Sequence, residues 1–589
     1  MSGEGGGAVV ERIGDGIRGG GGRRWKVWWR RSPGSFDGGS GARKVNPATG
    51  SADLATGCAG VTGDGEKEAR RRWPERKSRG GVRWKKMNTT AILCKTCFLP
   101  FSSLSVSRRC CASSFTRSKF HIMEIGNVNQ FLEGKTFLIT GATGLIAKIL
   151  REKLLRVQSN LKKLYVLVRE KDGKSATDRL RHEITDTDLF DVLRGKWGTD
   201  FDSFISQKVI AVAGDSAREN LGVHDQILRK EMWKEIDVVF NVAAATKFHE
   251  RYDVSFNTNT MGVMHIIDFA KNCEKIQLLL HVSTAYVSGE KTGLIPEKPL
   301  HMGEAMIGAQ KLDTDAEKRL IDETLEDLMS RQDSEDNIKK TMRELGQQRA
   351  VQYGWPNVYV FTKSMGEMLI GRLKENLPVV ILRPTVVTST YKEPVPGWIA
   401  GLRTIDPVLV AYGKGKLNFL FGKGSCFIDL IPADMVVNAM IVAAVANANK
   451  RPCMAIYQLG TSFRNPITIK RVFDLFFRYF HENPWTDTEG KSVTVLRLVD
   501  IHMVSVHRIR IFVDDLDRKF TTITKLVGVY KPYLCYNGIF KDDNTEELRI
   551  AARRNIGVDE TAFFFDPRII DWEDYFLRVH IPGAVRLHV

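Results

Sequence analysis

The sequence predicts an α/β protein in which a doubly wound parallel sheet is followed by a mainly helical C-terminal domain. Short β-prone apolar runs alternate with stretches of helical periodicity from about residue 125 to residue 460. A glycine turn joins the first run to the first helical stretch, as in dinucleotide-binding folds. From about residue 465 to residue 589 the alternation fades, and apolar clusters at helical spacing replace it. We therefore expect a Rossmann-type domain over 125–460 and a second domain over 465–589.

The first strand and helix enclose the glycine turn T-G-A-T-G-L-I-A at residues 140–147. Residues 135–139 are β-prone, and residues 147–155 have helical periodicity. Gly141 allows a tight turn, and Gly144 lets the backbone approach a pyrophosphate at the helix N-terminus. A glycine pattern alone is weak, but strand, turn and helix together predict a dinucleotide site. Its expected contacts are Thr140, Gly141, Thr143, Gly144, Leu145 and Ile146.

The second strand, residues 164–168, ends at Arg169. The residue at this position reads the adenosine ribose in dinucleotide folds. An arginine there would pair with the 2′-phosphate of NADPH, although an ordinary solvated arginine is the alternative. NADPH is therefore the expected cofactor.

Three further strands are expected to end beside the same ligand. Residues 208–213 lead to Asp215, which could meet the adenine amine, and residues 236–240 lead to Asn241 and small Ala243. Residues 278–282 lead to Ser283 and Thr284. Ligands of open α/β sheets bind at the carboxyl ends of strands, so these side chains belong to the candidate site.

A charged stretch, residues 312–349, predicts a solvated helical insertion that covers the site. It is followed by Tyr359 and Lys363, which are four residues apart on one face of a predicted helix. A strand at 378–384, a proline-rich loop at 391–398 and regular structure from 428 complete the domain. Tyr359 would supply a proton, and a lysine ammonium one turn away would lower the pKa of its phenol. The alternative is a chance surface pair.

Charge and composition limit the other functions. The net charge is +18, but residues 1–120 hold 24 Lys and Arg against 9 Asp and Glu, and the other 469 residues hold 63 against 60. The nearly neutral body offers no basic face for nucleic acid. No apolar run reaches the length of a membrane span, so any membrane contact is expected to be peripheral.

The first 120 residues are expected to be a disordered basic extension. Residues 87–120 contain seven Ser, four Thr, five Lys or Arg and no acid, which is typical of a transit peptide and favours a plastid. The alternative is a disordered basic linker that carries no targeting signal. We also hypothesise that Met87 is the working start of translation.

The nine cysteines are scattered, which indicates a reducing compartment, and no metal site is expected. A zinc site at Cys94, Cys97, Cys110 and Cys111 would lack surrounding hydrophobic structure. Cys426 and His281 could suggest a cysteine acyl-enzyme, but buried structural roles are favoured for both.

Several sequence motifs together resemble those of the fatty acyl-CoA reductase family, an extended branch of the short-chain dehydrogenase/reductases. They are T-G-A-T-G-L-I-A-K at 140–148, H-V-S-T-A-Y-V at 281–287, Y-V-F-T-K at 359–363, R-P-T-V-V at 383–387, S-T-Y-K-E-P-V-P-G-W-I at 389–399 and P-A-D-M-V-V-N at 432–438. Motifs near residues 530–533 and 571–583 are similar to those of the family's C-terminal male-sterility domain. The sequence departs from the family at Leu145, where an aromatic is usual, and at His249, where an aspartate is expected; residues 491–529 match poorly.

The resemblance implies NADPH-dependent reduction of a long-chain acyl thioester to a primary alcohol, for pollen-wall or surface lipid. Tyr359 and Lys363 would be catalytic, and Lys363 would also hold the nicotinamide ribose. Family spacing favours Thr284 over Ser283 as the residue that binds the substrate oxygen. The motifs do not separate acyl-CoA from acyl carrier protein; the plastid leader favours the carrier protein. Two other functions stay open: an NADP-dependent epimerase or carbonyl reductase, and a catalytically silent NADP-binding protein. Chain length and oligomeric state are not predicted.

Overall fold

The computed structural model describes residues 125–587, apart from 309–310, 418–419, 422–423, 451–453, 488, 498–499, 502–531, 534–535 and 555–560. The basic extension, the leader at 87–120, Met87 and the cysteines of the zinc alternative lie outside the described residues.

A seven-stranded parallel sheet with the order β12-β7-β5-β4-β1-β2-β3 forms the centre of the fold. Its strands are β1 (Thr136–Ile139), β2 (Lys163–Val168), β3 (Val209–Ala213), β4 (Val238–Asn241), β5 (Leu278–Val282), β7 (Val379–Pro384) and β12 (Met454–Leu459). The order changes direction on either side of β1, so the sheet is doubly wound. The fold class predicted from the sequence is confirmed, and each predicted strand lies within two residues of its observed bounds.

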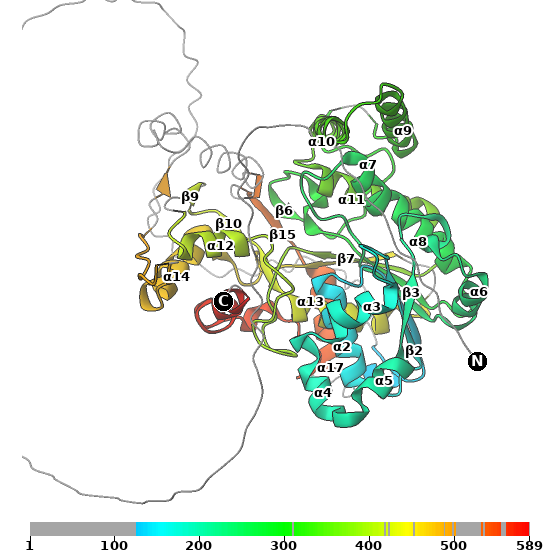
Figure 1. Ribbon diagram of the computed structural model, residues 1–589, viewed down its shortest axis with the longest axis horizontal. Coiled ribbons are helices and arrows are strands. Elements are labelled where there is room, and N and C mark those ends of the chain that lie inside the picture. The colour runs from blue at the N-terminus through cyan, green and yellow to red at the C-terminus, as the bar shows by residue number, and fades with distance from the viewer. Residues whose placement is uncertain are drawn as a thin grey trace, which may run out of the picture. The chain divides into compact units, whose positions relative to one another are not determined.

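Helices cover both faces of the sheet, which is why its strands are apolar throughout (Figure 1). Phe137 and Ile139 of β1 pack in one core with α2 (Leu145–Val157) and α13 (Ala433–Asn447). Leu138, between them, packs in the second core with residues of α8 (Gly262–Lys271) and α11 (Val358–Leu373). This alternation fixes the register of the strands and brings their carboxyl ends to one edge.

The remaining elements connect or extend these layers. The helices are α1 (Val128–Leu132), α3 (Ala176–Leu180), α4 (Asp191–Trp197), α5 (Phe201–Lys208), α6 (Gln226–Glu235), α7 (Tyr252–Phe256), α9 (Thr314–Ser330), α10 (Glu335–Gln352), α12 (Asp406–Gly413), α14 (Ile469–Glu482), α17 (Asp543–Arg554), α18 (Trp572–Asp574) and α19 (Ile581–Arg586). The short strands pair as β8 (Val386–Thr388) with β11 (Leu430–Pro432), β10 (Phe427–Ile428) with β13 (Ile467–Thr468), β15 (Gly538–Phe540) with β6 (Gly293–Ile295) and β14 (Asp500–Ile501) with β9 (Leu420–Phe421).

The charged insertion is helical, as predicted, but it does not cover the site. Its helices α9 and α10 lie at the outer edge of the molecule, beyond α7 and α11 (Figure 1), and no residue of either helix lines the pocket described below. Their apolar side chains, such as Ile321 and Met342, are buried in a third core that also contains Tyr252. The buried Glu317 accepts hydrogen bonds from Tyr252 and Arg349, which ties α9 to α7 and α10.

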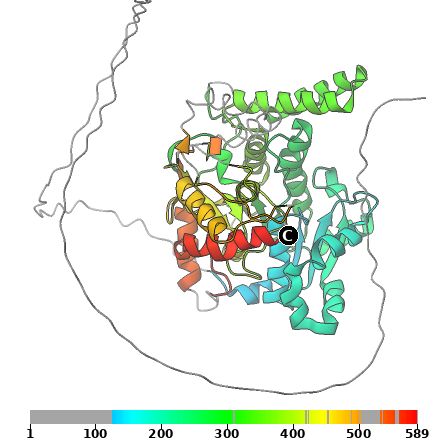
Figure 2. The ribbon, with the colours of Figure 1, turned by 60° about the vertical axis from the view of Figure 1, so that its left-hand side comes forward.

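The C-terminal segment packs on the same core as one face of the sheet. On α14 the apolar residues Ile469, Val472, Phe473, Phe476 and Phe480 follow helical spacing and are buried. Figure 2 brings forward the side that carries α14 and the last helices of the chain. The predicted domain boundary near residue 460 stays a prediction.

Among the described residues, no helix has both the length and the apolar character needed to cross a membrane.

Candidate active site

A pocket of about 790 Å³ lies at the carboxyl edge of the sheet. Its wall contains residues that follow β1, β2, β3, β4, β5 and β7, together with residues 403–405, Val408, part of α14 and Tyr533. The predicted site residues that line it are Gly141, Thr143, Gly144, Leu145, Ile146, Arg169, Asp215, Ala243, Ser283, Thr284 and Tyr359. Thus five strand ends and the α11 helix bring these residues together.

The glycine turn has the backbone geometry of an anion cradle. Gly141 has a φ of +69°, and a Cβ there would lie 2.7 Å from the Cα of Ala243. Gly144 is the N-cap of α2 and offers no side-chain cap to the first-turn N–H groups. These N–H groups stay available for a ligand phosphate, and the turn is too close to Ala243 for a side chain. The turn therefore fits a dinucleotide pyrophosphate.

Thr140 and Asn241 lie behind the wall of the pocket. Both are buried, and the Thr140 hydroxyl donates to Asn241 Oδ1 at 2.7 Å. The same hydroxyl oxygen accepts the backbone N–H groups of Val242 and Ala243 at 3.1 Å. In this structure the two residues hold the turn after β1 against the turn after β4.

Arg169 and Asp215 lie at the side of the pocket that follows β2 and β3. The Arg169 side chain is 67% exposed, and its Nη1 is 3.9 Å from Asp215 Oδ2. Arg179, which also lines the pocket, donates to the backbone carbonyl of Arg169. The other two nitrogens of the Arg179 guanidinium donate to the Glu183 carboxylate, so Arg169 is the more exposed of the two guanidinium groups near the end of β2.

Tyr359 and Thr284 bring two hydroxyl groups into the pocket. Burial raises the pKa of Tyr359 to about 12, and a hydrogen bond with Thr284 acts in the opposite direction. Thr284 Oγ1 lies 3.5 Å from the carbonyl of Pro384. Phe248 packs against Tyr359 and stacks on Tyr533, which closes this side with aromatic rings.

Lys363 is buried and does not line the pocket. Its amine donates to the carbonyl of Val282 at 2.7 Å and lies 3.1 Å from His281 Nε2. Burial lowers the pKa of Lys363 to about 7, while Glu367, one turn further along α11, acts against that shift. Among the described residues no hydrogen bond joins the amine to the Tyr359 hydroxyl.

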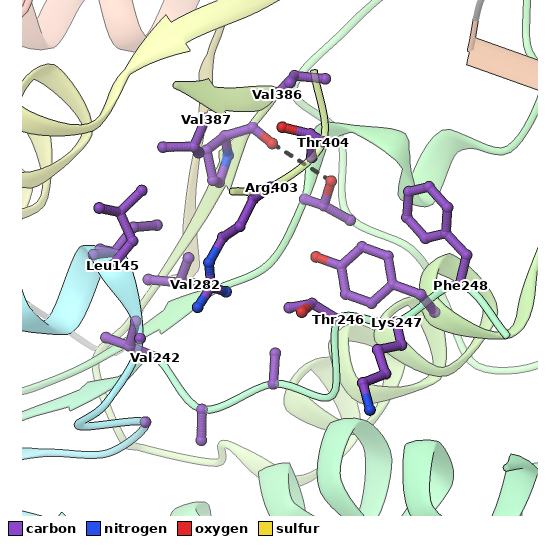
Figure 3. Close-up of a pocket in the computed structure, with 18 of the residues that line it drawn as sticks. Leu145, Val242, Thr246, Lys247, Phe248, Val282, Val386, Val387, Arg403 and Thr404 are labelled. Carbon is purple, nitrogen blue, oxygen red and sulfur yellow. Dashed lines mark hydrogen bonds between the residues drawn. The ribbon is translucent and has the colours of Figure 1, made fainter. Parts of the chain in front are cut away.

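Several residues of the pocket were not predicted. Arg403 extends into its middle, between Leu145 and Thr246 (Figure 3). The apolar part of the wall consists of Val386, Val387, Ile405, Val408, Leu417, Ile428, Ile469, Val472 and Phe473. A signal for the last two was present, since they belong to the apolar cluster of α14. Nothing in the sequence indicates that this cluster faces the strand ends.

The cysteine acyl-enzyme has no geometric support, because neither Cys426 nor His281 lines the pocket and both are buried.

Comparison with known proteins gives two family matches and several curated relatives. A family described as "Male sterility protein" matches residues 139–440, and a second family of the same description matches residues 495–589. The "Alcohol-forming fatty acyl-CoA reductase" of Simmondsia chinensis is 47% identical over 78% of this chain and 99% of its own length. "Fatty acyl-CoA reductase 1" of Arabidopsis thaliana is 45% identical over 78% of this chain and 98% of its own length.

A third relative carries a location in its name. "Fatty acyl-CoA reductase 2, chloroplastic" of Arabidopsis thaliana is 38% identical over 78% of this chain and 79% of its own length. Among solved structures, the terminal reductase domain of the myxalamid biosynthetic pathway superposes with a TM-score of 0.49 at 16% identity, over 77% of this chain and 92% of that domain.

Proposed function

This chain belongs to the male sterility family of fatty acyl-CoA reductases, and on that premise we propose that it reduces a long-chain fatty acyl thioester to the primary alcohol with NADPH. The observation that carries the proposal is the composition of one pocket. A glycine turn suited to a dinucleotide, the hydroxyls of Thr284 and Tyr359, and a continuous set of apolar side chains all line it.

The apolar wall suits an acyl chain. It is formed by β8, by residues 405–417 and by the buried face of α14. Behind Phe473 the space is filled by Tyr412 and Phe476, whose rings lie 6.4 Å and 5.3 Å from it. The chain would therefore end against α14, with its thioester near Tyr359.

The reaction needs two hydrides and two protons for each thioester, which becomes one alcohol and one free thiol. When bound, the reduced nicotinamide supplies the hydride to the carbonyl carbon in each round. Thr284 and Tyr359 donate hydrogen bonds to the oxygen on which negative charge develops, in a site partly screened from water. Tyr359 gives its proton to that oxygen, and the charged form of Lys363 stabilises the phenolate. After the first round the hemithioacetal releases the thiol and leaves the aldehyde for the second.

We propose NADPH over NADH because Arg169 follows β2, where the adenosine ribose is read. Its guanidinium group is largely exposed and free to turn toward a 2′-phosphate, since the 3.9 Å contact with Asp215 is long for a hydrogen bond. Asp215 would remain close to the adenine, as the sequence indicated.

We propose a plastid location and acyl carrier protein as the preferred carrier, with acyl-CoA also accepted. The support is the composition of residues 87–120 and the likeness to a relative named chloroplastic. The local basic patch that we suggest for an acidic carrier, residues 414–423, is described only in part; in it Lys414 lies over the ring of Trp485. The alcohol would serve pollen-wall or surface lipid.

The proposal is tested with the purified full-length chain, NADPH or NADH, and hexadecanoyl groups on CoA or on acyl carrier protein. We expect hexadecanol, formed faster with NADPH and from both carriers. No alcohol and no thioester-dependent NADPH oxidation would refute the reductase. Alcohol from CoA alone, with a cytosolic signal from a C-terminal fluorescent fusion in leaf cells, would refute only the carrier and the location.

A further inference from the structure

A buried chain of hydrogen bonds runs behind the pocket, from the glycine turn to Lys363. The Thr140 hydroxyl donates to Asn241 Oδ1 at 2.7 Å, and Asn241 Nδ2 lies 3.0 Å from His281 Nδ1. His281 Nε2 in turn lies 3.1 Å from the Lys363 amine. All four side chains are at most 2% exposed. Water therefore cannot reach these groups, so each donor in the chain must face an acceptor of its neighbouring side chain.

The direction of each hydrogen bond follows from Thr140. Its oxygen already accepts two backbone N–H groups, from Val242 and Ala243. The hydroxyl hydrogen must then be donated, and the Asn241 side chain must receive it with its oxygen. The Asn241 NH₂ consequently faces His281 Nδ1, which has to accept. A neutral His281 then carries its proton on Nε2 and points that N–H at Lys363.

An N–H group directed at the Lys363 amine disfavours the ammonium form. A neutral amine can accept this hydrogen bond through its lone pair while one of its own N–H groups donates to the Val282 carbonyl at 2.7 Å. An ammonium group has only donors, so it would face the His281 N–H donor to donor. For His281 Nε2 to accept from Lys363, Nδ1 would have to donate to the Asn241 oxygen, and the Asn241 NH₂ would then point at Thr140. The Thr140 oxygen would in that case receive three N–H donors, one more than its two lone pairs can accept.

We propose that His281 is a positioning residue for Lys363, which keeps the lysine amine uncharged in the cofactor-free protein and thereby couples dinucleotide binding to uptake of a proton by Lys363. The proposal rests on the proposed function, because only the reductase mechanism requires Lys363, one helical turn after Tyr359, to be charged. The bound dinucleotide is anionic, and its negative charge favours the ammonium form.

The groups around Lys363 agree with this assignment. From α11 it is approached by Glu367, which favours the charge, but that carboxylate is bound to the buried Arg383 of β7. From β5 it is approached by His281, whose pKa burial lowers well below its usual value, so the imidazole is neutral and adds no positive charge. Tyr359, one turn earlier on α11, is neutral at physiological pH because burial raises its pKa. Because the pKa of Lys363 is about 7, the binding of an anionic ligand can change the charge of its amine near neutral pH.

Two substitutions reverse the final hydrogen bond without touching Lys363 or Tyr359. In His281→Gln the amide oxygen, with its two lone pairs, can accept from both the Asn241 NH₂ and an ammonium group at Lys363. In Asn241→Asp the carboxylate accepts from His281 Nδ1–H, so Nε2 becomes an acceptor. Both variants should therefore hold Lys363 charged before the dinucleotide binds.

The test is calorimetric titration of the full-length chain with NADPH at pH 8, in phosphate and in Tris, two buffers with different ionisation enthalpies. For the unmodified chain we expect uptake of roughly 0.5 to 1 proton per NADPH, because a group with a pKa of about 7 is mostly unprotonated at this pH. For His281→Gln and Asn241→Asp we expect uptake close to zero.

Binding without proton uptake by the unmodified chain would overturn the role of His281 and leave the reductase standing. Unchanged uptake in both variants would do the same, since a merely structural histidine predicts that result. If NADPH does not bind to the unmodified chain, the proposed function fails and this inference fails with it.

Discussion

At the scale of single residues, Arg169 is the residue that we propose determines the choice between NADPH and NADH. It lines the pocket at the end of β2, and its side chain is largely in solvent. If it pairs with a 2′-phosphate, Arg169→Ala should reduce the preference for NADPH over NADH by about 1.5 to 3 kcal/mol, the range for a charged hydrogen bond. The measurement is kcat/KM for both cofactors at constant salt.

Lys171→Ala is the matched control for this prediction. Lys171 is another exposed cation, near Asp172, and it does not line the pocket. Its loss should leave the cofactor ratio unchanged. Equal use of NADPH and NADH by the unmodified chain would contradict the role of Arg169.

The presence of the proposed catalytic residues in the pocket was predictable where a local pattern identifies them. Tyr359 and Thr284 follow from the helix spacing, the strand end and the family resemblance, and the structure places both in the pocket. The contact between Lys363 and His281 was not predictable, because it joins residues 82 positions apart. Only packing of α11 on β5 reveals it.

At the scale of elements, α14 contributes Ile469, Val472 and Phe473 to the apolar wall, and we propose that it limits the length of the acyl chain. Val472→Phe should shorten the preferred acyl chain, and Phe473→Ala should lengthen it. Each buried methylene is worth about 0.8 kcal/mol, so a shift of two methylenes changes the ratio of rates between neighbouring even chain lengths roughly tenfold. The measurement is competition among C14, C16 and C18 thioesters.

Leu475→Ala is the control on the same helix. Leu475 is buried but does not line the pocket, so its truncation should lower stability without changing chain-length preference. If Val472→Phe and Phe473→Ala shift the preference in the same direction, or not at all, α14 does not form the end of the acyl site.

The elements also show why parts of the fold could be predicted. The strands carry continuous apolar runs because both faces of the sheet are covered, and the sequence shows this directly. The place of α9 and α10 was predicted wrongly, because alternating charges identify a solvated helix without saying what its buried face contacts. Ile321 and Met342 pack beside α7, away from the pocket.

At the scale of the whole molecule, Glu297 ties the C-terminal segment to the sheet. Just beyond β6, its carboxylate accepts hydrogen bonds from the backbone of Gln458 in β12 and from the Thr545 hydroxyl in α17. Burial raises the pKa of Glu297 to about 7, and these hydrogen bonds oppose the shift only in part. The folded protein therefore binds this proton more tightly than the unfolded chain does.

The raised pKa of Glu297 predicts a dependence of stability on pH. In the unfolded chain the carboxyl titrates near its ordinary value, so its contribution is present below about pH 4.5 and is lost as the pH rises through about 7. The loss is at most about 3.5 kcal/mol, at about 1.4 kcal/mol for each pKa unit over the shift from 4.5 to about 7. Glu297→Gln should therefore lose fewer degrees of Tm between pH 5 and pH 8 than the unmodified chain.

Glu304→Gln, which replaces a more exposed carboxyl nearby, is the control: its Tm should fall between pH 5 and pH 8 by as much as the Tm of the unmodified chain. The Tm at pH 5 of Glu297→Gln can itself be lower, because an amide cannot accept all the hydrogen bonds of the carboxylate. Parallel Tm curves for Glu297→Gln and the unmodified chain would show that Glu297 does not titrate in this range.

The central claim is that Tyr359 supplies the proton in an NADPH-dependent reduction, and the most direct measurement compares Tyr359→Phe with the unmodified chain. With hexadecanoyl thioester and saturating NADPH, alcohol formation should fall by roughly 10²-fold or more, because the proton donor is lost. NADPH affinity should stay nearly constant, and Tyr457→Phe, at a buried tyrosine outside the pocket, should keep the full rate. Alcohol formation by Tyr359→Phe at the unmodified rate would contradict the claim.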